Sequence, residues 1–114
     1  MKNLDGLTMF VSSTADDGVV SCETHLHFVQ RGWRVAGRYA GGRVARGCLV
    51  GRWVGDALHF RYAQREDGRT IHAGHSECHV RELPDGRLRL IEQFAWDTRP
   101  GSGVNVFDEL PNAI

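Results

Sequence analysis

The feature that most constrains this chain is a two-residue alternation of apolar and polar side chains, broken at short intervals by glycine. In the clearest segment, residues 87–97, every second side chain belongs to the set Leu88, Leu90, Glu92, Phe94 and Trp96. Successive side chains of a strand point to opposite faces, so this segment predicts a strand with one buried face. Helical periodicity is nearly absent from the chain. We therefore predict an all-β protein.

The same alternation recurs upstream and assigns one face of each segment to the interior. The side chains predicted to point inward are Thr24, Leu26, Phe28 and Gln30, then Trp33, Val35, Gly37 and Tyr39, then Leu49, Gly51 and Trp53, and finally Leu58, Phe60 and Tyr62. Their outward neighbours are mostly Arg, His and Ala. Each segment is thus expected to be half buried.

Two short turns predict how the first of these strands pair, because paired residues must lie on the same face. A two-residue turn at Arg31 and Gly32 would place Gln30 opposite Trp33. A loop over residues 54–57 would place Trp53 opposite Leu58. Both registers bring inward residues together, which supports the face assignment.

Later turns extend the register to the predicted strand over 87–97. A loop over residues 65–69 would place His72 opposite Tyr62. A three-residue turn at 84–86 would place Cys78 opposite Glu92. Strands near 7–12 and 104–110 bring the total to about eight. Short connections without crossover helices favour a single antiparallel up-and-down barrel over 1–114, rather than a Greek-key sandwich.

Composition narrows the expected partners and location. Lys plus Arg number 14 and Asp plus Glu number 14, so the zero net charge predicts neither a nucleic-acid nor an anionic-membrane partner. There is no stretch of roughly 20 apolar residues for a membrane helix, and residues 1–10 lack an apolar signal core. Three cysteines, an odd number, fit a reducing compartment rather than a disulfide framework. We expect a cytoplasmic protein.

Several motifs resemble a family of small bacterial proteins of about this length. They are G-R-Y-A-G-G at 37–42, G-C-L-V-G at 47–51, F-R-Y-A-Q at 60–64, L-P-D-G-R-L-R-L at 83–90 and E-Q-F-A-W at 92–96. Members often carry the label "N-acetylglutamate synthase". Because this sequence has no αβ pattern and no glycine-rich acetyl-CoA loop at a helix start, we do not assign that activity.

The Gly37-x-Tyr39 hairpin is similar to that of avidin and streptavidin, in a barrel of the avidin or lipocalin type. In the avidin family the equivalent tyrosine lines the ligand cavity, and the resemblance implies that role for Tyr39. The aromatic set of a biotin site is not clearly reproduced in this sequence. The resemblance therefore predicts the barrel and a cavity residue, and not biotin as the ligand.

Glu92 is the most informative candidate residue, because it is the lone carboxylate on a face of apolar side chains. Burial raises the pKa of a carboxyl group toward the range useful to a general acid or base. The alternative is a structural Glu92 that pairs with an Arg or bonds to neighbouring strands. The candidate catalytic residues are Glu92, Tyr39, Tyr62 and His72.

An aromatic interior with a few polar groups is the pattern of a small-molecule site. The predicted ligand-binding residues are Phe28, Trp33, Tyr39, Trp53, Phe60, Tyr62, Ser76, Cys78, Glu92, Phe94 and Trp96. Eight-stranded barrels can instead be filled by side chains, so the pattern alone does not decide between the two.

We predict no metal and no cofactor. The spacing H-x-x-H-x-x-C-H over 72–79 matches no closed zinc pattern, and alternation places His75 and His79 on the opposite face from His72 and Cys78.

Three hypotheses follow from these residues. The leading one is a barrel that binds a small, largely apolar or aromatic molecule, with Tyr39, Tyr62 and Glu92 orienting its polar end. The second is an enzyme of small-molecule metabolism, such as a cyclase, isomerase or dehydratase, in which Glu92 moves a proton. The third is a non-catalytic interaction protein with a filled barrel, for example a homodimer joined through its outer His-rich faces.

Overall fold

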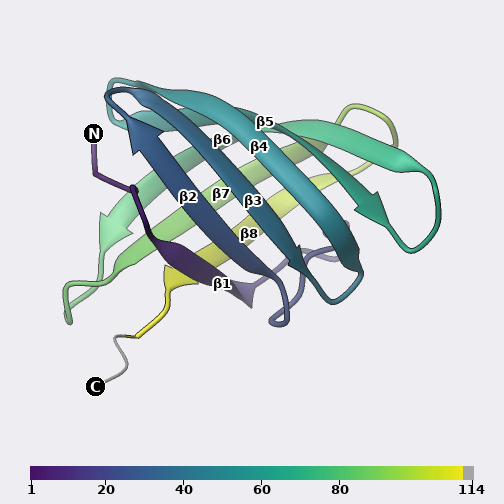
Figure 1. Cartoon of the computed structure of the whole chain (residues 1–114), viewed down its shortest axis with the longest axis horizontal. Helices are drawn as coiled ribbons and strands as arrows, with labels where there is room; N and C mark the ends of the chain where they lie inside the picture. The colour runs from purple at the N-terminus through teal and green to yellow at the C-terminus, as the bar shows by residue number, and fades with distance from the viewer. Residues whose placement is uncertain (112–114) are drawn as a thin grey trace.

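Eight antiparallel strands form a closed barrel in the computed structural model, which describes residues 1–111 (Figure 1). The strands are β1 (Thr8–Ser13), β2 (His25–Arg31), β3 (Arg34–Gly41), β4 (Val44–Val54), β5 (Ala57–Glu66), β6 (Ile71–Glu82), β7 (Leu88–Trp96) and β8 (Ser102–Glu109). Each strand pairs with the next along the chain, and β8 closes the barrel against β1. This confirms the predicted all-β, up-and-down architecture. Residues 1–111 contain no helix long and apolar enough to cross a membrane.

The N-terminal segment closes one end of the barrel, beside the β2–β3, β4–β5 and β6–β7 turns (Figure 1). Leu4 is fully buried there. Its backbone N–H donates to Gln30 Oε1 at 3.0 Å, and the indole of Trp53 donates to the same oxygen at 3.3 Å. This end is therefore plugged by packed side chains.

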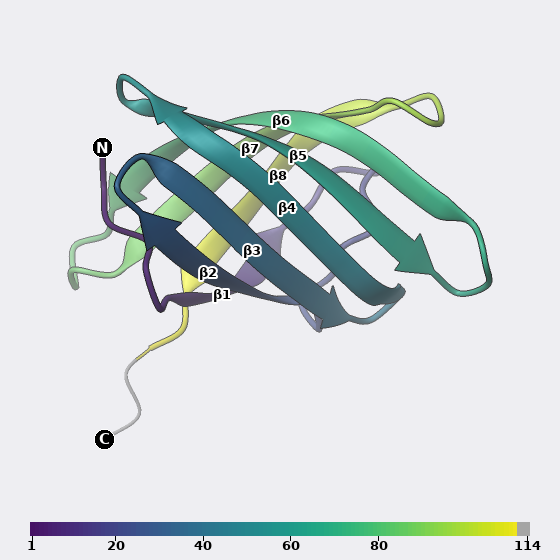
Figure 2. The same cartoon turned by 45° about the horizontal axis from the view of Figure 1, so that its top comes forward.

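The other four connections lie at the opposite end, where they surround the mouth of the barrel (Figure 2). They are the β1–β2 loop over 14–24 and the β3–β4, β5–β6 and β7–β8 connections. Val19 of the β1–β2 loop is buried and packs on the core. This loop covers the mouth.

Two of the four predicted registers are confirmed. Trp53 lies opposite Leu58, and Cys78 lies opposite Glu92. Backbone hydrogen bonding from Leu83 N to Arg87 O at 2.7 Å closes the 84–86 turn as expected.

The other two predicted registers are wrong by two residues. Gln30 pairs with Val35, and Tyr62 pairs with Gly74 rather than with His72. A shift by two leaves each residue that stays within a strand on its predicted face, because side chains alternate with a period of two. Alternation could not detect the error.

The prediction that Trp33 faces the interior is also wrong. The β2–β3 turn consists of Gly32 and Trp33, with Gly32 at a φ of 59°, which glycine adopts without steric cost. Trp33 is 51% exposed, with the guanidinium of Arg34 4.9 Å from its ring centroid. The positive φ sets the turn one residue later than predicted.

Candidate ligand-binding site

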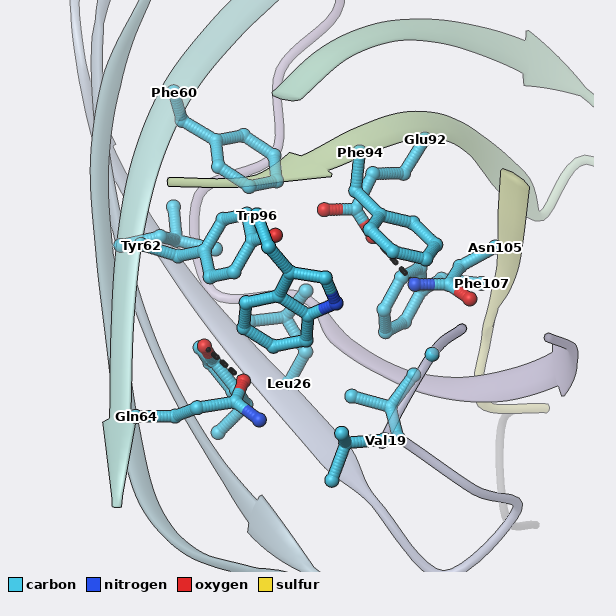
Figure 3. Close-up of a pocket in the computed structure, with 14 residues that line it drawn as sticks. Val19, Leu26, Phe60, Tyr62, Gln64, Glu92, Phe94, Trp96, Asn105 and Phe107 are labelled. Atoms are coloured by element: carbon cyan, nitrogen blue, oxygen red, sulfur yellow. Dashed lines mark hydrogen bonds between the residues drawn. The ribbon is translucent and has the colours of Figure 1, made fainter. Parts of the chain in front are cut away.

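Glu92 lies inside the barrel near the middle of β7 and is 6% exposed. The hydroxyl of Ser76, on β6, donates to Glu92 Oε2 at 2.5 Å. From the other side, Asn105 Nδ2 of β8 donates to Oε1 at 3.0 Å (Figure 3). Neighbouring strands therefore hold the carboxyl group through one bond to each oxygen.

The surroundings of Glu92 disfavour its charged form. Burial raises the pKa of this carboxyl above its ordinary value, and the donors Ser76 and Asn105 offset only part of that effect. Both donors are uncharged, and among residues 1–111 no ion pair involves Glu92. Of the two forms of the structural alternative, the pair with an Arg is absent from this part of the chain, whereas the bonds to neighbouring strands are present, from Ser76 and Asn105.

An aromatic wall faces the carboxyl group (Figure 3). The ring of Tyr62 meets the ring of Trp96 edge to face, with centroids 5.3 Å apart. Phe94 meets Trp96 at 6.1 Å, and Phe60 meets Tyr62 at 6.3 Å, again edge to face. Such contacts hold the rings in defined orientations and make a rigid apolar surface.

A hydrogen-bonded chain runs from the interior to the mouth. Tyr39 Oη donates to Gln64 Oε1 at 2.8 Å, and Gln64 Nε2 donates to Glu66 Oε2 at 3.1 Å. Arg99 of the β7–β8 loop binds both oxygens of Glu66, at 3.1 and 2.5 Å. Its guanidinium also lies 3.8 Å from the centroid of the Trp96 ring. This chain ties β3, β5 and the β7–β8 loop together at the rim.

The tyrosines of the site remain neutral. Burial, followed by the nearby Glu92 carboxyl, raises the pKa of both Tyr39 and Tyr62 well above the ordinary phenol value. Each hydroxyl therefore keeps its proton and can donate a hydrogen bond. Tyr62 uses its hydroxyl only in a long bond of 3.4 Å to the Ala95 carbonyl.

A cavity of about 30 Å³ lies between these groups. Its lining residues are Gly18, Val19, Val20, Leu26, Tyr39, Leu49, Phe60, Tyr62, Gln64, Glu92, Phe94, Trp96, Asn105 and Phe107. A space of this size holds a water molecule or two, since one water needs roughly 10–15 Å³ on the same measure. The interior is thus nearly filled while the β1–β2 loop covers the mouth.

The β1–β2 loop is held over the cavity by three hydrogen bonds. Trp96 Nε1 donates to the Asp17 carbonyl at 3.0 Å, and Asp17 Oδ2 accepts from Ser102 N at 3.2 Å. Thr14 Oγ1 donates to Asn105 Oδ1 at 2.7 Å. Because Asn105 also binds Glu92, the loop is linked to the buried carboxyl group through this one side chain.

Six of the predicted ligand-binding residues line this cavity: Tyr39, Phe60, Tyr62, Glu92, Phe94 and Trp96. Ser76 contacts it through Glu92, and Cys78 is buried beside them, opposite Glu92. Phe28 and Trp53 are buried in the core and do not line it. Trp33 lies outside the barrel.

His72 is the predicted catalytic residue that the fold keeps away from Glu92. It is half buried at the mouth, where its Nδ1 lies 2.9 Å from Thr98 Oγ1 and its ring packs against Trp96. In the strand register Glu92 pairs with Cys78, six residues further along β6. The two-residue register shift moved His72 from beside Tyr62 to beside Gln64.

Asn105, Gln64, Val19 and Phe107 are cavity residues that the sequence prediction missed. Alternation could have identified Asn105 and Phe107, which share one face of the predicted strand over 104–110. Gln64 continues the inward series Phe60 and Tyr62. Nothing in the sequence indicates that Val19, in a loop, folds over the mouth.

Across the described part of the chain, no three His, Cys, Asp or Glu side chains are grouped so that they could hold a metal ion. The outward histidines His25, His27, His59, His75 and His79 are exposed.

Comparison with known proteins places this barrel in a family. A family model described as avidin-like protein matches residues 2–110. The chain belongs to the avidin-like family. The resemblance inferred from the Gly37-x-Tyr39 hairpin is therefore confirmed, and Tyr39 of this avidin-like barrel does line its interior cavity. Neither a curated protein nor a solved structure showed significant similarity to the chain.

Proposed function

We propose that this avidin-like barrel binds a small, largely apolar or aromatic molecule, whose polar end is oriented by Glu92, Tyr39 and Tyr62. One observation supports this above the others: a buried carboxyl group with uncharged partners faces an aromatic cavity. Such an arrangement of apolar walls and a few polar groups suits a ligand site. Membership of a family whose type members bind small ligands such as biotin points the same way.

The hydrogen-bonding capacity of the site defines the polar end of the ligand. Each oxygen of Glu92 accepts one bond from the protein, and a carboxylate oxygen has two lone pairs. One acceptor position on each oxygen therefore remains for an N–H or O–H group of the ligand. Tyr62 supplies a donor nearby, since its own bond to Ala95 is long. A ligand with a donor and an acceptor on adjacent atoms fits best.

Ligand entry requires the β1–β2 loop to move. The cavity of about 30 Å³ is too small for an aromatic ring, and Val19 and Val20 occupy its mouth. Few contacts hold the loop: it contains no regular secondary structure, and its polar anchors to the barrel are the hydrogen bonds of Asp17, Thr14 and, at its end, Thr24. Loops of this kind open at low free-energy cost.

A fluorescent probe tests the proposal. N-phenyl-1-naphthylamine is apolar and aromatic, carries one N–H group, and fluoresces strongly when it leaves water. The proposal predicts a saturable rise in its fluorescence with the wild-type protein. Val19→Phe, which fills the mouth, should reduce the affinity about tenfold or more. Val104→Phe, on the exposed outer face of β8, is the matched control and should leave it unchanged.

Glu92→Gln should also weaken the probe, by roughly 1 kcal/mol or more if its N–H bonds the carboxylate. The absence of saturable binding of this probe, and of biotin as a second probe, would contradict the proposal. That result would favour a filled barrel that acts as an interaction protein.

The raised pKa of Glu92 favours one second candidate, an enzyme in which this carboxyl group moves a proton. Tyr39 or Tyr62 would then stabilise developing charge as hydrogen-bond donors. These groups suit a cyclase, isomerase or dehydratase, in which the reaction involves proton transfer. Retention of substrate affinity with loss of turnover in Glu92→Gln would establish the enzyme over the binder.

A further inference from the structure

The fold gathers a large share of the positive charge on one outer face. Residues 25–65, which span β2–β5, contain eight Arg, no Lys and a single acid, Asp56, before Glu66 ends β5. The eight are Arg31, Arg34, Arg38, Arg43, Arg46, Arg52, Arg61 and Arg65, and all are exposed. The strands β2–β5 are consecutive neighbours in the barrel (Figure 2). Their exposed arginines therefore belong to one side of the barrel, called here the arginine face.

The arginine face is unneutralised. In residues 1–111, none of its eight arginines takes part in an ion pair. Elsewhere on the barrel, Arg87, Arg89 and Arg99 each bind an acidic side chain. The difference follows from the sequence, since residues 25–66 contain only two acids: Asp56, whose partner is the N-terminus, and Glu66, whose partner is Arg99.

Several of these arginines lie directly opposite one another on paired strands. Arg34 pairs with Arg31 on one side and with Arg52 on the other, and Arg52 in turn pairs with His59. Arg46 pairs with Arg65. Like charges in directly opposed positions destabilise a sheet. A bound polyanion would relieve this repulsion.

Two grooves run across the arginine face. The first, of about 890 Å³, is lined by Ala36, Val50 and Gly51 together with Arg34, Arg52 and Arg61. The second, of about 780 Å³, is lined by Ala40, Ala45 and Ala63 together with Arg38, Arg46 and Arg65. Each groove thus combines three or more arginines with small or medium apolar residues.

We propose that the arginine face binds single-stranded nucleic acid through its phosphates. Arginine presents a planar fork that matches phosphate in two hydrogen bonds, whereas lysine is a point charge, and this face carries arginine alone. Trp33 lies exposed at the edge of the first groove and offers a surface on which a base can stack. A charged channel with an aromatic platform is the usual design of a sequence-tolerant single-strand site.

Other occupants fit this face less well. Two copies of the chain that met through it around a two-fold axis would place arginines against arginines. Binding to an anionic membrane requires only a flat basic surface. It would explain neither the grooves nor the use of arginine in place of lysine. The expectation against nucleic acid rested on a net charge of zero, which averages this face with the acidic remainder of the surface.

Fluorescence anisotropy with a fluorescein-labelled oligothymidylate of about 20 nucleotides tests the proposal, since single-strand sites cover ~4–16 nucleotides per domain. The wild-type protein should bind at low salt, with an affinity that falls as salt rises. The triple variant Arg38→Gln/Arg46→Gln/Arg65→Gln should bind about tenfold or more weakly. Its slope of log affinity against log salt should be smaller by about 2, at ~0.7 for each phosphate that the variant no longer neutralises.

The matched control is Lys2→Gln/Arg69→Gln/Arg81→Gln, which removes the same charge from exposed positions outside both grooves. It should change the affinity less than about twofold. A second groove variant, Arg34→Gln/Arg52→Gln, should weaken binding in the same direction as the first.

Four results would overturn the proposal. The first two are no binding by the wild-type protein at low salt and equal weakening by the control. The third is that the wild-type protein binds phosphatidylglycerol vesicles but not the oligonucleotide, and that the groove variants lose this vesicle binding. The last is that light scattering gives the groove variants a lower molecular mass than the wild type, while their oligonucleotide binding is unchanged. That result would assign the face to self-association.

Discussion

The ring of Tyr39 lies directly over the backbone of Gly47, its partner across the β3–β4 pair. A Cβ atom at Gly47 would lie 2.3 Å from Tyr39 Cζ, closer than any side chain permits. The same relation recurs between Tyr62 and Gly74, where a Cβ would lie 2.3 Å from the tyrosine hydroxyl oxygen. Glycine opposite each tyrosine thus makes the room in which the polar aromatic side chains of the site lie flat against the barrel wall.

Gly47→Ala should lower the free energy of unfolding by about 1–3 kcal/mol, because an added methyl group must displace the Tyr39 ring. Urea denaturation followed by circular dichroism measures the change. In a Tyr39→Leu background the cost of Gly47→Ala should shrink, since the flexible leucine can move aside. Equal costs in the two backgrounds would show that the ring is not what the methyl group meets.

The change in the free energy of unfolding caused by Glu92→Gln should be more favourable at neutral pH than in acid. Burial raises the pKa of Glu92 in the folded state above its value in the unfolded chain. The favourable contribution of Glu92 to the stability of the wild-type protein is therefore complete at a pH below the ordinary carboxyl pKa. It is lost as the pH rises through the raised pKa of the folded state. Thermal unfolding of both proteins between acid and neutral pH measures the difference.

Trp96→Phe should loosen the β1–β2 loop without unfolding the barrel, because it removes the indole N–H that holds the Asp17 carbonyl. Hydrogen exchange should accelerate at Gly18, whose amide donates to the Ala15 carbonyl within the loop. The amides of β4 and β5 should keep their protection. Trp33→Phe, at an exposed turn, is the control; faster exchange throughout the barrel in Trp96→Phe would argue for a structural role of the indole instead.

Two of the three cysteines should react with Ellman's reagent in the native protein. Cys22 and Cys48 are exposed, whereas Cys78 is fully buried. Burial, and after it the nearby Glu92 carboxyl, raises the pKa of the Cys78 thiol well above its ordinary value, which suppresses the reactive thiolate. The third equivalent should appear only in denaturant. Rapid reaction of Cys78 in the native state would mean that the interior opens more often than the packing implies.

Much of the barrel follows from local sequence signals. A period of two along each segment determines which side chains face inward, and glycine with positive φ marks turns such as Gly32 and Gly86. For that reason Glu92, Tyr39, Tyr62 and the aromatic residues of β7 could be assigned to the interior from the sequence alone. The pairing of Cys78 with Glu92 also followed, because the 84–86 turn has one favoured geometry.

Register, loop placement and surface charge were decided only by the tertiary structure. A two-residue slip keeps each residue that stays within a strand on its face, so alternation could not distinguish Gly74 from His72 as the partner of Tyr62. The burial of Val19 over the cavity depends on Trp96 and Asn105, which are distant in the chain. Likewise, the arginines are scattered along the sequence, and they form one face only because β2–β5 lie side by side. Each of these features arises from contacts between segments far apart in sequence, which no local pattern encodes.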